Sequence, residues 1–381
     1  MIDVLAIACV AIWIYLIGAR GEFWRAAVDD ASPVSSGRPP LGSVVIVIPA
    51  RNESEFIARS VRSLLGQNYE GSFNVVVVDD ESNDDTAAVA IRAASGDRRL
   101  KVIRTDGPAA GWTGKLWALK EGIAVAEALQ PEYLLLTDAD IVHASDTLAQ
   151  LVARSRNGGF ALTSLMAKLR CESLAERVHV PAFIYFFQML FPFTWVCRSD
   201  RGLAAAAGGC MLVRTEALKK IGGVACIQNA LIDDCSLAAK LKGTGPIWLG
   251  LTNRVCSIRP YKTFADVGRM ISRSAYSQLR YSPVLLIATT IAMTITFVLP
   301  PLLSLFASGW PRYLGLAAWI AMALSFVPTL RYYGRSLVWS IALPVIALLY
   351  MCYTLNSAYQ HLRQRGGQWK GRVHTNAPSL Q

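Results

Sequence analysis

Histidine and cysteine offer little for metal or redox chemistry in this chain. Among 381 residues there are four histidines and eight cysteines, and the cysteines are scattered with no Cys-x-x-Cys pair. This spacing does not suggest a zinc site, and a cytoplasmic location would keep the thiols reduced. The net charge is +11, yet no nucleic-acid-reading motif accompanies it. The basic residues therefore favour association with a membrane, and nucleic acid is not expected as a partner.

Charged residues are also sparse. They make up 17% of the chain against 53% hydrophobic residues, and the mean hydropathy of +0.35 is too high for an ordinary soluble enzyme. Apolar sequence gathers in residues 2–18 and in three stretches long enough to cross a bilayer, residues 283–307, 313–330 and 337–353. Only Asp3 precedes the first apolar run, so it is expected to be an uncleaved anchor rather than a signal peptide.

Basic residues beside the apolar stretches predict their orientation. Arg20 and Arg25 follow the first stretch, which places the next part of the chain in the cytoplasm. Three later crossings would put the basic residues of the segment 363–372 outside, against the same rule. We therefore expect one of the three to be re-entrant or interfacial, with Pro300–Pro301 and Pro344 marking the candidates.

Between the apolar stretches, strand-type runs alternate with helical patterns. The runs cover residues 44–48, 75–78, 101–104 and 133–136. Such alternation predicts an α/β fold with a doubly wound, Rossmann-like parallel sheet. The loop after the first run is Pro49-Ala50-Arg51-Asn52-Glu53. It lacks the Gly-x-Gly-x-x-Gly of dinucleotide-binding dehydrogenases, which argues against an oxidoreductase.

The fourth run ends in two carboxylates, Asp138 and Asp140, one residue apart. In an open α/β sheet ligands bind at this carboxyl edge. Two carboxylates there would suit Mg²⁺ or Mn²⁺, with waters and the phosphates of a nucleotide completing the coordination. Taken alone, an Asp-x-Asp pair is more simply a solvated loop or a helix N-cap, so the surrounding segments must decide.

Those segments form an ordered set. They are the loop 49–53, the pair Asp79-Asp80, Gly114-Lys115-Leu116-Trp117-Ala118-Leu119, the Asp138/Asp140 pair, residues 208–214 and Ile232-Asp233-Asp234. From Ser43 to Tyr281 the chain thus resembles family-2 glycosyltransferases of the GT-A fold. Residues 111–118, 231–238 and 273–281 are most similar to the membrane glycosyltransferases associated with bacterial hopanoid biosynthesis, relatives of ceramide glucosyltransferases.

The resemblance implies an activity and its partners. We expect metal-dependent, inverting transfer of one sugar from a nucleotide-sugar donor to a membrane lipid, with a hopanoid as the candidate acceptor and partners in a lipid-biosynthesis pathway. Two rival functions stay open. A processive polysaccharide synthase shares the motifs but needs a bundle of spans around a channel and an intact closing motif. A degenerate transferase would act as a scaffold for lipid modification.

The resemblance also assigns donor-binding residues. They are Pro49, Arg51, Glu53, Asp79, Asp80, Lys115 and Asp138, with Asp138 and Asp140 as metal ligands. A carboxylate such as Asp80 can accept a hydrogen bond from a base N–H. The alternative, an acidic turn facing a helix dipole, fits Asp84 and Asp85 better. Lys115 begins a helical pattern, where an ammonium and backbone N–H groups favour a diphosphate; a solvated surface lysine is the alternative.

The expected catalytic residues are Asp233, Asp234 and Arg273. The family places its general base in an acidic pair before a helix, which gives this role to Asp234. Flanking apolar residues suggest a burial that raises a carboxyl pKa, and a helix N-cap is the alternative. Two features depart from the family. Arg273 alone survives from the closing Gln-x-x-Arg-Trp motif, and Glu81 follows the first acidic pair where relatives have glycine.

These patterns predict a division of the chain. The expected parts are a transmembrane anchor (1–20), a linker (21–42), a cytoplasmic GT-A domain (43–260), an amphipathic interfacial helix (261–281), two or three membrane segments (283–355) and a basic tail (356–381). Lys262, Arg269, Arg273 and Arg280 would hold the amphipathic helix on the anionic inner leaflet. Residues 182–196 either dip into the same interface or form a buried core helix. The protein is expected to be integral to the inner (cytoplasmic) membrane.

Overall fold

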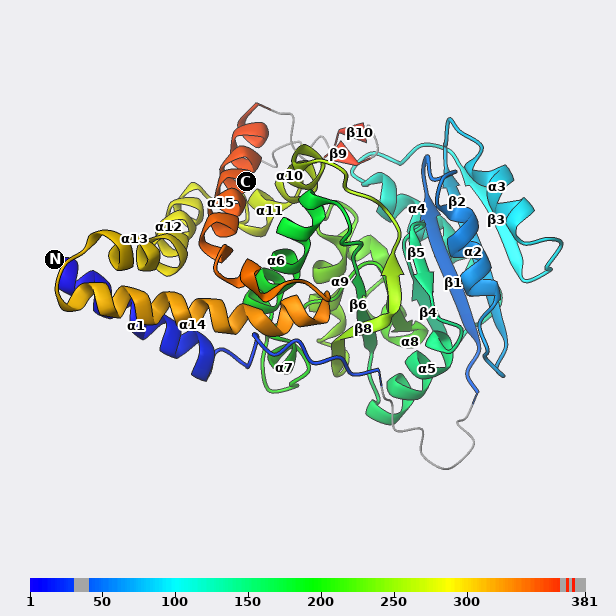
Figure 1. The fold of residues 1–381 in the computed structure, drawn as a ribbon. Helices are drawn as coiled ribbons and strands as arrows, with labels where there is room; N and C mark the ends of the chain where they lie inside the picture. Colours follow the sequence, from blue (N-terminus) through cyan, green and yellow to red (C-terminus); the bar gives the residue numbers. More distant parts are fainter. Residues whose placement is uncertain (31–40, 364–367, 370–371, 374–381) are drawn as a thin grey trace. The chain divides into compact units, whose positions relative to one another are not determined.

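The computed structural model describes residues 1–30, 41–363, 368–369 and 372–373 (Figure 1). The chain divides into two compact units. One, the helical unit, comprises Met1–Ala27, Arg170–Trp195 and Pro260–Gly367. The other, the α/β unit, comprises Val28–Leu169, Val196–Arg259 and Gln368–Gln381.

A mixed sheet of eight strands forms the α/β unit, in the order β3-β2-β1-β4-β7-β6-β8-β5. The strands are β1 (Val44–Ala50), β2 (Phe73–Asp80), β3 (Leu100–Thr105), β4 (Tyr133–Leu136), β5 (Ile141–His143), β6 (Leu162–Lys168), β7 (Met211–Arg214) and β8 (Ile247–Ser257). Strands β3, β2, β1 and β4 pair in parallel, which confirms the predicted Rossmann-like half. Strand β7 is antiparallel to β4 and β6 and carries the sheet beyond that half.

Helices cover both faces of the parallel half. They are α2 (Ile57–Leu65), α3 (Thr86–Ala93), α4 (Gly114–Glu127) and α5 (Thr147–Gly158), and the shorter α8 (Thr215–Lys220) and α9 (Asp233–Leu241) follow β7. Every residue of β1 is buried. Because side chains alternate along a strand, Ile46 and Ile48 share a core with α2 while Val47 faces α4. Burial on both faces explains why β1 reads as an unbroken apolar run.

Gly122 lets helix α4 lie close to the sheet. A Cβ at this position would lie 2.5 Å from Val47 Cγ1 and 2.7 Å from Val78 Cγ2. We expect Gly122→Ala to destabilise the protein, because overpacking costs about 1–3 kcal/mol and outweighs a helix-propensity gain of about 1 kcal/mol. The melting temperature of the full chain in detergent should fall by about 2–4 °C for each kcal/mol lost. Ala124→Ser, at an exposed position of the same helix, should leave it unchanged; an equal or higher melting temperature for Gly122→Ala would contradict the packing argument.

The helical unit contains the apolar stretches. Its helices are α1 (Ile2–Ala19), α6 (Leu174–Leu190), α10 (Phe264–Ser272), α11 (Ala275–Gln278), α12 (Pro283–Met293), α13 (Leu299–Phe306), α14 (Trp310–Tyr332) and α15 (Leu343–Leu362), with a π-helical turn at Thr294–Val298 between α12 and α13. The short α7 (Phe193–Val196) begins in this unit. Among the described residues, three helices are long and apolar enough to cross a membrane: Ile2–Ala19, Pro283–Phe306 and Trp310–Tyr332.

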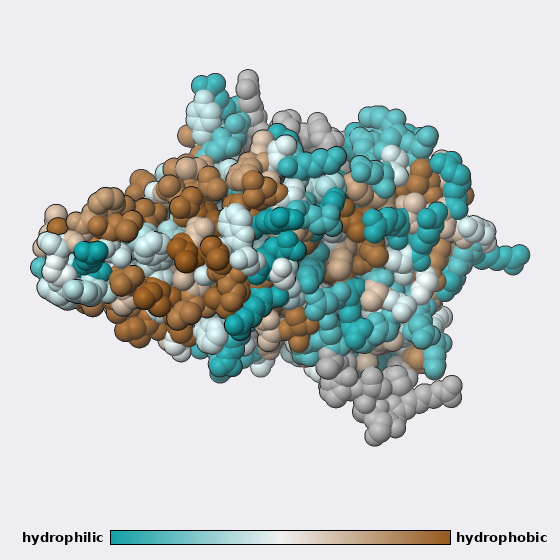
Figure 2. Space-filling view, viewed as in Figure 1, coloured by the Kyte–Doolittle hydropathy of each residue, from teal (hydrophilic) through white to brown (hydrophobic). Residues whose placement is uncertain are grey.

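Large apolar side chains lie on the surface of these helices. Val284 is 74% exposed, Phe306 80% and Leu324 64%. In Figure 2 hydrophobic residues gather over α12, α13 and α14. A contiguous apolar surface of this kind is typical of a protein that contacts lipid or another protein.

Two segments of the helical unit bear on the sequence predictions. One prediction is wrong, and one pair of alternatives is decided. Residues 261–281 were expected as one amphipathic helix, but the structure has α10 and α11, separated at Arg273 and Ser274. The chain leaves the helical region at Ser274, the N-cap residue of α11, which has a φ of −121° and a ψ of −9°. For residues 182–190 the structure has the buried-helix alternative, because they continue α6, whose Ala182, Ile184 and Tyr185 are fully buried.

Candidate active site

The loops after β1 and β2 hold each other in place. Arg51 Nη1 donates to the backbone oxygens of Asp80 (2.5 Å) and Glu81 (3.1 Å). The backbone N–H of Glu53 donates to Thr86 Oγ1 at 2.8 Å. Glu81 has a φ of +48°, so it adopts the left-handed conformation that glycine adopts more easily. The departure from the family pattern at Glu81 therefore keeps a glycine-like turn.

Asp79 and Asp80 are buried at the end of β2. Asp79 Oδ1 accepts a hydrogen bond from the backbone N–H of Ser82 at 3.1 Å. Asp80 is 0% exposed, and its Oδ2 lies 4.0 Å from Arg51 Nη1. In this conformation both carboxylates support the loops, and Asp80 would reach a nucleotide base only after these loops shift.

Lys115 brings together acids from two parts of the chain. It lies in the first turn of α4, whose N-cap Thr113 accepts from the backbone N–H of Leu116. Its ammonium is 2.9 Å from Asp138 Oδ1, beyond the end of β4, and 3.0 Å from Asp233 Oδ2, at the start of α9. A lysine held between two carboxylates is not the solvated surface lysine of the alternative interpretation.

Asp234 is fixed beside this ion pair by backbone groups. Its Oδ2 accepts from the N–H of Gly208 at 2.9 Å and its Oδ1 from the N–H of Cys235 at 2.7 Å. A Cβ on Gly208 would lie 3.4 Å from both Asp234 Oδ2 and Lys115 Nζ. Lys115 and Asp234 therefore converge on one bare backbone position, and we name them, together with Asp138 and Asp233, the carboxylate–lysine cluster.

Burial and mutual charge set the protonation of the cluster. Burial, reinforced by the neighbouring Asp233, raises the pKa of Asp234 to about 6, although Lys115 opposes the shift. Burial also raises the pKa of Asp138, again against the opposing charge of Lys115. For Lys115 burial acts to lower the pKa, but the charges of Asp138 and Asp233 outweigh it and the pKa is raised. Lys115 thus stays cationic near neutral pH, while Asp234 titrates in the range useful to a general base.

A buried histidine ties β4 to the glycine segment. Thr137, directly before Asp138, donates from Oγ1 to the backbone oxygen of Gly209 at 2.7 Å and lies 3.0 Å from His143 Nε2. Burial lowers the pKa of His143 to about 4, so the imidazole is neutral at physiological pH. Because the hydroxyl proton goes to Gly209, His143 donates through Nε2. The network fixes the end of β4 against residues 208–209.

Arg259 is a functional candidate that sequence reasoning missed. It follows β8, and its Nη2 contacts Glu53 Oε1 at 2.7 Å and Oε2 at 2.6 Å. Its Nε lies 2.9 Å from Asp140 Oδ2, which also accepts from Ser257 Oγ at 3.2 Å. Arg259 therefore connects two predicted site residues, Glu53 and Asp140. Arg259 follows a long strand and lies at the same sheet edge as Asp140. This position could have identified it as a candidate site residue from the sequence.

Asp138 and Asp140 face different partners. Asp138 pairs with Lys115, and Asp140 pairs with Arg259, each through one oxygen. No group of three or more His, Cys, Asp or Glu residues able to hold a metal occurs among the residues that the structure describes. The two carboxylates offer only oxygen donors, which fits a hard cation such as Mg²⁺ or Mn²⁺ if a ligand such as a diphosphate completes the shell.

Arg273 belongs to the helical unit. It is the exposed C-cap residue of α10, and its backbone N–H donates to the Arg269 oxygen at 3.0 Å. Its proposed catalytic role stays a prediction. The same holds for Pro49, which lies within β1 and pairs in register with Val78.

The sheet order and the acids at its carboxyl edge define an α/β protein of the GT-A type. A solved structure with the same fold is the mannosyltransferase of Pyrobaculum calidifontis in complex with GDP-Man and Mn²⁺, which matches at a TM-score of 0.54 and 18% identity over 95% of this chain and 99% of that chain. Residues 45–222 match the family model "Glycosyl transferase family 2". Residues 45–222 are therefore similar to family 2 glycosyltransferases, and the fold is of the GT-A type.

Two curated relatives show where the similarity lies. The chain is 28% identical over 207 residues to beta-monoglucosyldiacylglycerol synthase of Trichormus variabilis, covering 53% of this chain and 41% of the relative. It is 29% identical over 121 residues to 4,4'-diaponeurosporenoate glycosyltransferase of Staphylococcus haemolyticus, covering 31% of this chain and 30% of the relative. The chain thus spans less than half the length of these curated relatives.

Proposed function

We propose that the protein transfers one sugar, with inversion and with a divalent cation, from a nucleotide-sugar donor to the hydroxyl of a membrane lipid. The observation that carries the proposal is the carboxylate–lysine cluster at the carboxyl edge of a domain that is similar to family 2 glycosyltransferases. A lipid acceptor is supported by the three helices apolar enough to cross a membrane and by the relative named as a glucosyldiacylglycerol synthase. A hopanoid is the acceptor we propose to test first.

Lys115 would receive the diphosphate of the donor. Its ammonium lies in the first turn of α4, where free backbone N–H groups and the helix dipole also favour an anion. A cation at Asp138 and Asp140 would add electrophilic stabilisation of the leaving diphosphate. Arg259 keeps Asp140 and Glu53 oriented around that position.

Asp234 would act as the general base. It takes the proton of the acceptor hydroxyl while the hydroxyl oxygen bonds to the anomeric carbon and the nucleoside diphosphate leaves with the electron pair of the broken C–O bond. The pKa of about 6 leaves the carboxylate mostly ionised at neutral pH. A single displacement of this kind inverts the anomeric centre and needs no nucleophilic side chain.

The described membrane helices allow a simple topology. The first helix would place Arg20 and Arg25 in the cytoplasm, as the positive-inside rule requires. The helices Pro283–Phe306 and Trp310–Tyr332 would then cross outward and back, which puts Arg331 and Arg335 on the cytoplasmic side as well. Helix α15 does not belong to the three candidate spans, so the basic tail would stay on that side.

The direct test uses the full chain in nanodiscs. Incubation with individual nucleotide sugars and a bacterial lipid extract should give a new lipid bearing one sugar, detected by mass spectrometry. Products with many sugars would instead indicate a processive synthase. Absence of both lipid glycosylation and donor hydrolysis would favour the scaffold alternative. Comparing lipids from a deletion strain with those of the parent would identify the acceptor.

Basic residues of the helical unit should dock the protein on anionic lipid. Lys262, Arg269 and Arg280 are exposed, although Arg269 is paired with Asp266 at 2.5 Å. Each basic residue near such a surface contributes about 1 kcal/mol. We expect replacement of the three by Gln to lower activity on anionic liposomes about tenfold or more, since 1.4 kcal/mol is about tenfold, while activity toward a short, water-soluble acceptor is unchanged.

A matched triple variant controls for net charge. Arg59→Gln, Arg92→Gln and Arg98→Gln remove the same charge from exposed positions of the α/β unit. Activity of this control should match wild type on both acceptors. If the first triple variant loses activity on both acceptors in parallel, the docking role is wrong.

A catalytic Arg273 predicts a different result. Arg273→Ala should impair activity toward the liposome acceptor and toward the water-soluble acceptor alike.

A further inference from the structure

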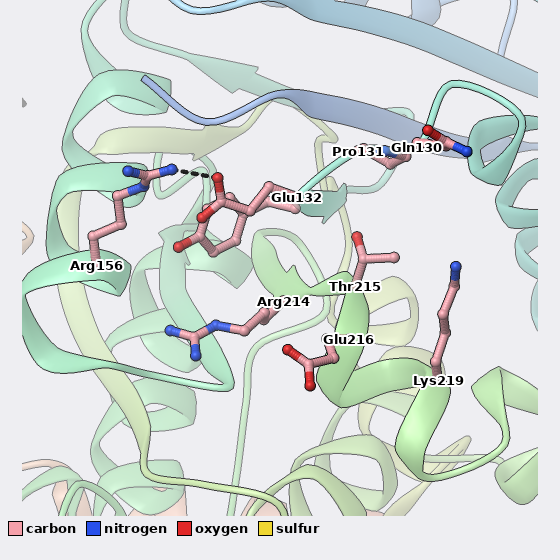
Figure 3. Close-up of a pocket in the computed structure, with 9 residues that line it drawn as sticks. Gln130, Pro131, Glu132, Arg156, Arg214, Thr215, Glu216 and Lys219 are labelled. Carbon is pink, nitrogen blue, oxygen red and sulfur yellow. Dashed lines mark hydrogen bonds and ion pairs between the residues drawn. The ribbon is translucent and has the colours of Figure 1, made fainter. Parts of the chain in front are cut away.

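A pocket lies in the α/β unit at the end of β4 remote from Asp138 (Figure 3). Its volume is about 730 Å³, and its walls come from the loop before β4, from α5, and from the junction of β7 with α8. Tyr133 and Arg214 pair across β4 and β7 at this end, whereas Leu136 and Met211 pair at the end near the cluster. The pocket and the carboxylate–lysine cluster therefore lie at opposite ends of the same two strands.

Two cations in the pocket wall take no part in a close ion pair within the described part of the chain, although the pKa of Glu216, lowered mainly by its hydrogen bond with Lys220, is lowered further by Arg214. Arg156 forms an ion pair with Glu132, the dashed contact of Figure 3. Glu216 is paired with Lys220, which lies outside the pocket, at 3.0 Å. Arg214 and Lys219 form no ion pair with any other described residue. The lining alone carries a net charge of +1, from Arg156, Arg214 and Lys219 against Glu132 and Glu216, and Lys220 beside Glu216 raises the local charge to +2.

A buried hydroxyl lines the same pocket. Thr215 is 6% exposed, and its Oγ1 has no hydrogen-bond partner among the described residues. A buried polar group without a partner costs about 1–3 kcal/mol. The hydroxyl follows Arg214 directly in the chain; its oxygen is shielded from solvent, so a ligand oxygen would complete its hydrogen bonding once the Thr215 side chain rotates toward the pocket.

We propose that this pocket binds the phosphate group of a phosphorylated ligand, separately from the sugar donor. A phosphate monoester carries a charge of about −1.5 to −2 at neutral pH, and the excess of positive charge around the pocket favours such an anion. The planar Arg214 guanidinium suits phosphate oxygens, Lys219 adds a point charge, and Thr215 adds a neutral donor. The volume lies within the range of small-molecule sites, so the pocket holds more than the phosphate itself.

The test measures phosphate binding by the full chain in neutral detergent. Because Lys115 is also proposed to bind phosphate groups, the Lys115→Gln background removes that contribution. Equilibrium dialysis with inorganic phosphate probes a soluble ligand, and dioctanoyl phosphatidate, compared with dioctanoyl glycerol, probes a lipid headgroup. We expect saturable binding that survives Lys115→Gln. Binding of phosphatidate but not of inorganic phosphate would identify the source as lipid, and the reverse result would identify a soluble phosphate.

Three variants assign the binding to this pocket. Arg214→Gln with Lys219→Gln should weaken binding at least tenfold, and Arg92→Gln, which removes an exposed cation that does not line the pocket, should change it less than twofold. Thr215→Val keeps the side-chain shape and should weaken binding severalfold even if the double variant folds poorly. Absence of saturable binding of both probes, or equal binding by all variants, would overturn the proposal.

Discussion

Replacing Asp234 by Asn should lower kcat by about 10²-fold or more, the usual scale for a lost acid-base group, with donor affinity nearly unchanged. The substitution keeps the size of the side chain and one oxygen, which can accept from the N–H of either Gly208 or Cys235 but not of both. It removes the ability to take a proton, together with one of these two backbone hydrogen bonds. The loss should therefore fall on turnover of the donor–acceptor complex.

Asp233→Asn is the matched control for this experiment. Asp233 is the ion-pair partner of Lys115 at 3.0 Å, so its loss should disturb the proposed diphosphate site and weaken donor binding. Donor affinity by calorimetry and kcat by product formation separate the two variants. If Asp234→Asn loses donor affinity and turnover equally, Asp234 caps α9 and is not the base.

The pH profile gives a second readout for Asp234. A general base acts in its ionised form, so kcat/KM of the wild type should fall about tenfold per unit as the pH drops below about 6. Asp234→Asn should lack this acidic limb in its residual rate. Because the folded-state pKa lies above the ordinary value of 3.8, the ionised carboxylate costs stability as pH rises through about 6. The variant escapes this cost at pH 7.5 but leaves one backbone N–H without its acceptor, so its stability should stay close to that of wild type.

Local sequence patterns were sufficient for the parallel half of the sheet and for the acids at its edge. Strands β1, β2 and β4 are short apolar runs, and the residues that follow such runs must lie at one edge. Lys115 and Asp233 were separately assigned to helix starts, and the structure brings both to Asp138. The apolar periodicity predicted the strands, and the order of the motifs predicted which charged residues follow them.

The contacts that could not be predicted from the sequence are tertiary contacts between residues far apart in the chain. Arg259 reaches Glu53 across 206 positions, a pairing that no local pattern encodes. Arg51 was expected to contact the donor, but it also donates to backbone oxygens of the next loop, a bond that depends on how two loops pack. The break between α10 and α11 likewise follows the backbone angle of Ser274 in an otherwise amphipathic segment.

Removing the divalent cation should abolish transfer, and Asp140→Asn should have the same effect. Electrophilic stabilisation of a leaving diphosphate is worth several kcal/mol, which corresponds to a loss of about 10³-fold or more. Donor binding should weaken as well, since the cation would link Asp138 and Asp140 to the diphosphate. Activity after EDTA treatment, restoration by added Mn²⁺ or Mg²⁺, and Mn²⁺ affinity by electron paramagnetic resonance measure these effects.

Asp140 also positions Arg259, whose Nε lies 2.9 Å from Asp140 Oδ2. The experiment must therefore separate metal binding by Asp140 from positioning of Arg259. Arg259→Gln breaks that ion pair but leaves the carboxylate available to a cation, so this variant should still bind Mn²⁺ and keep its metal-dependent activity at a reduced level. Ser257→Ala removes only the 3.2 Å hydrogen bond to Asp140 and should behave nearly as wild type. If Asp140→Asn and Arg259→Gln lose activity equally while both retain Mn²⁺ affinity, Asp140 acts by positioning Arg259. Undiminished activity of the wild type in EDTA would exclude the cation altogether.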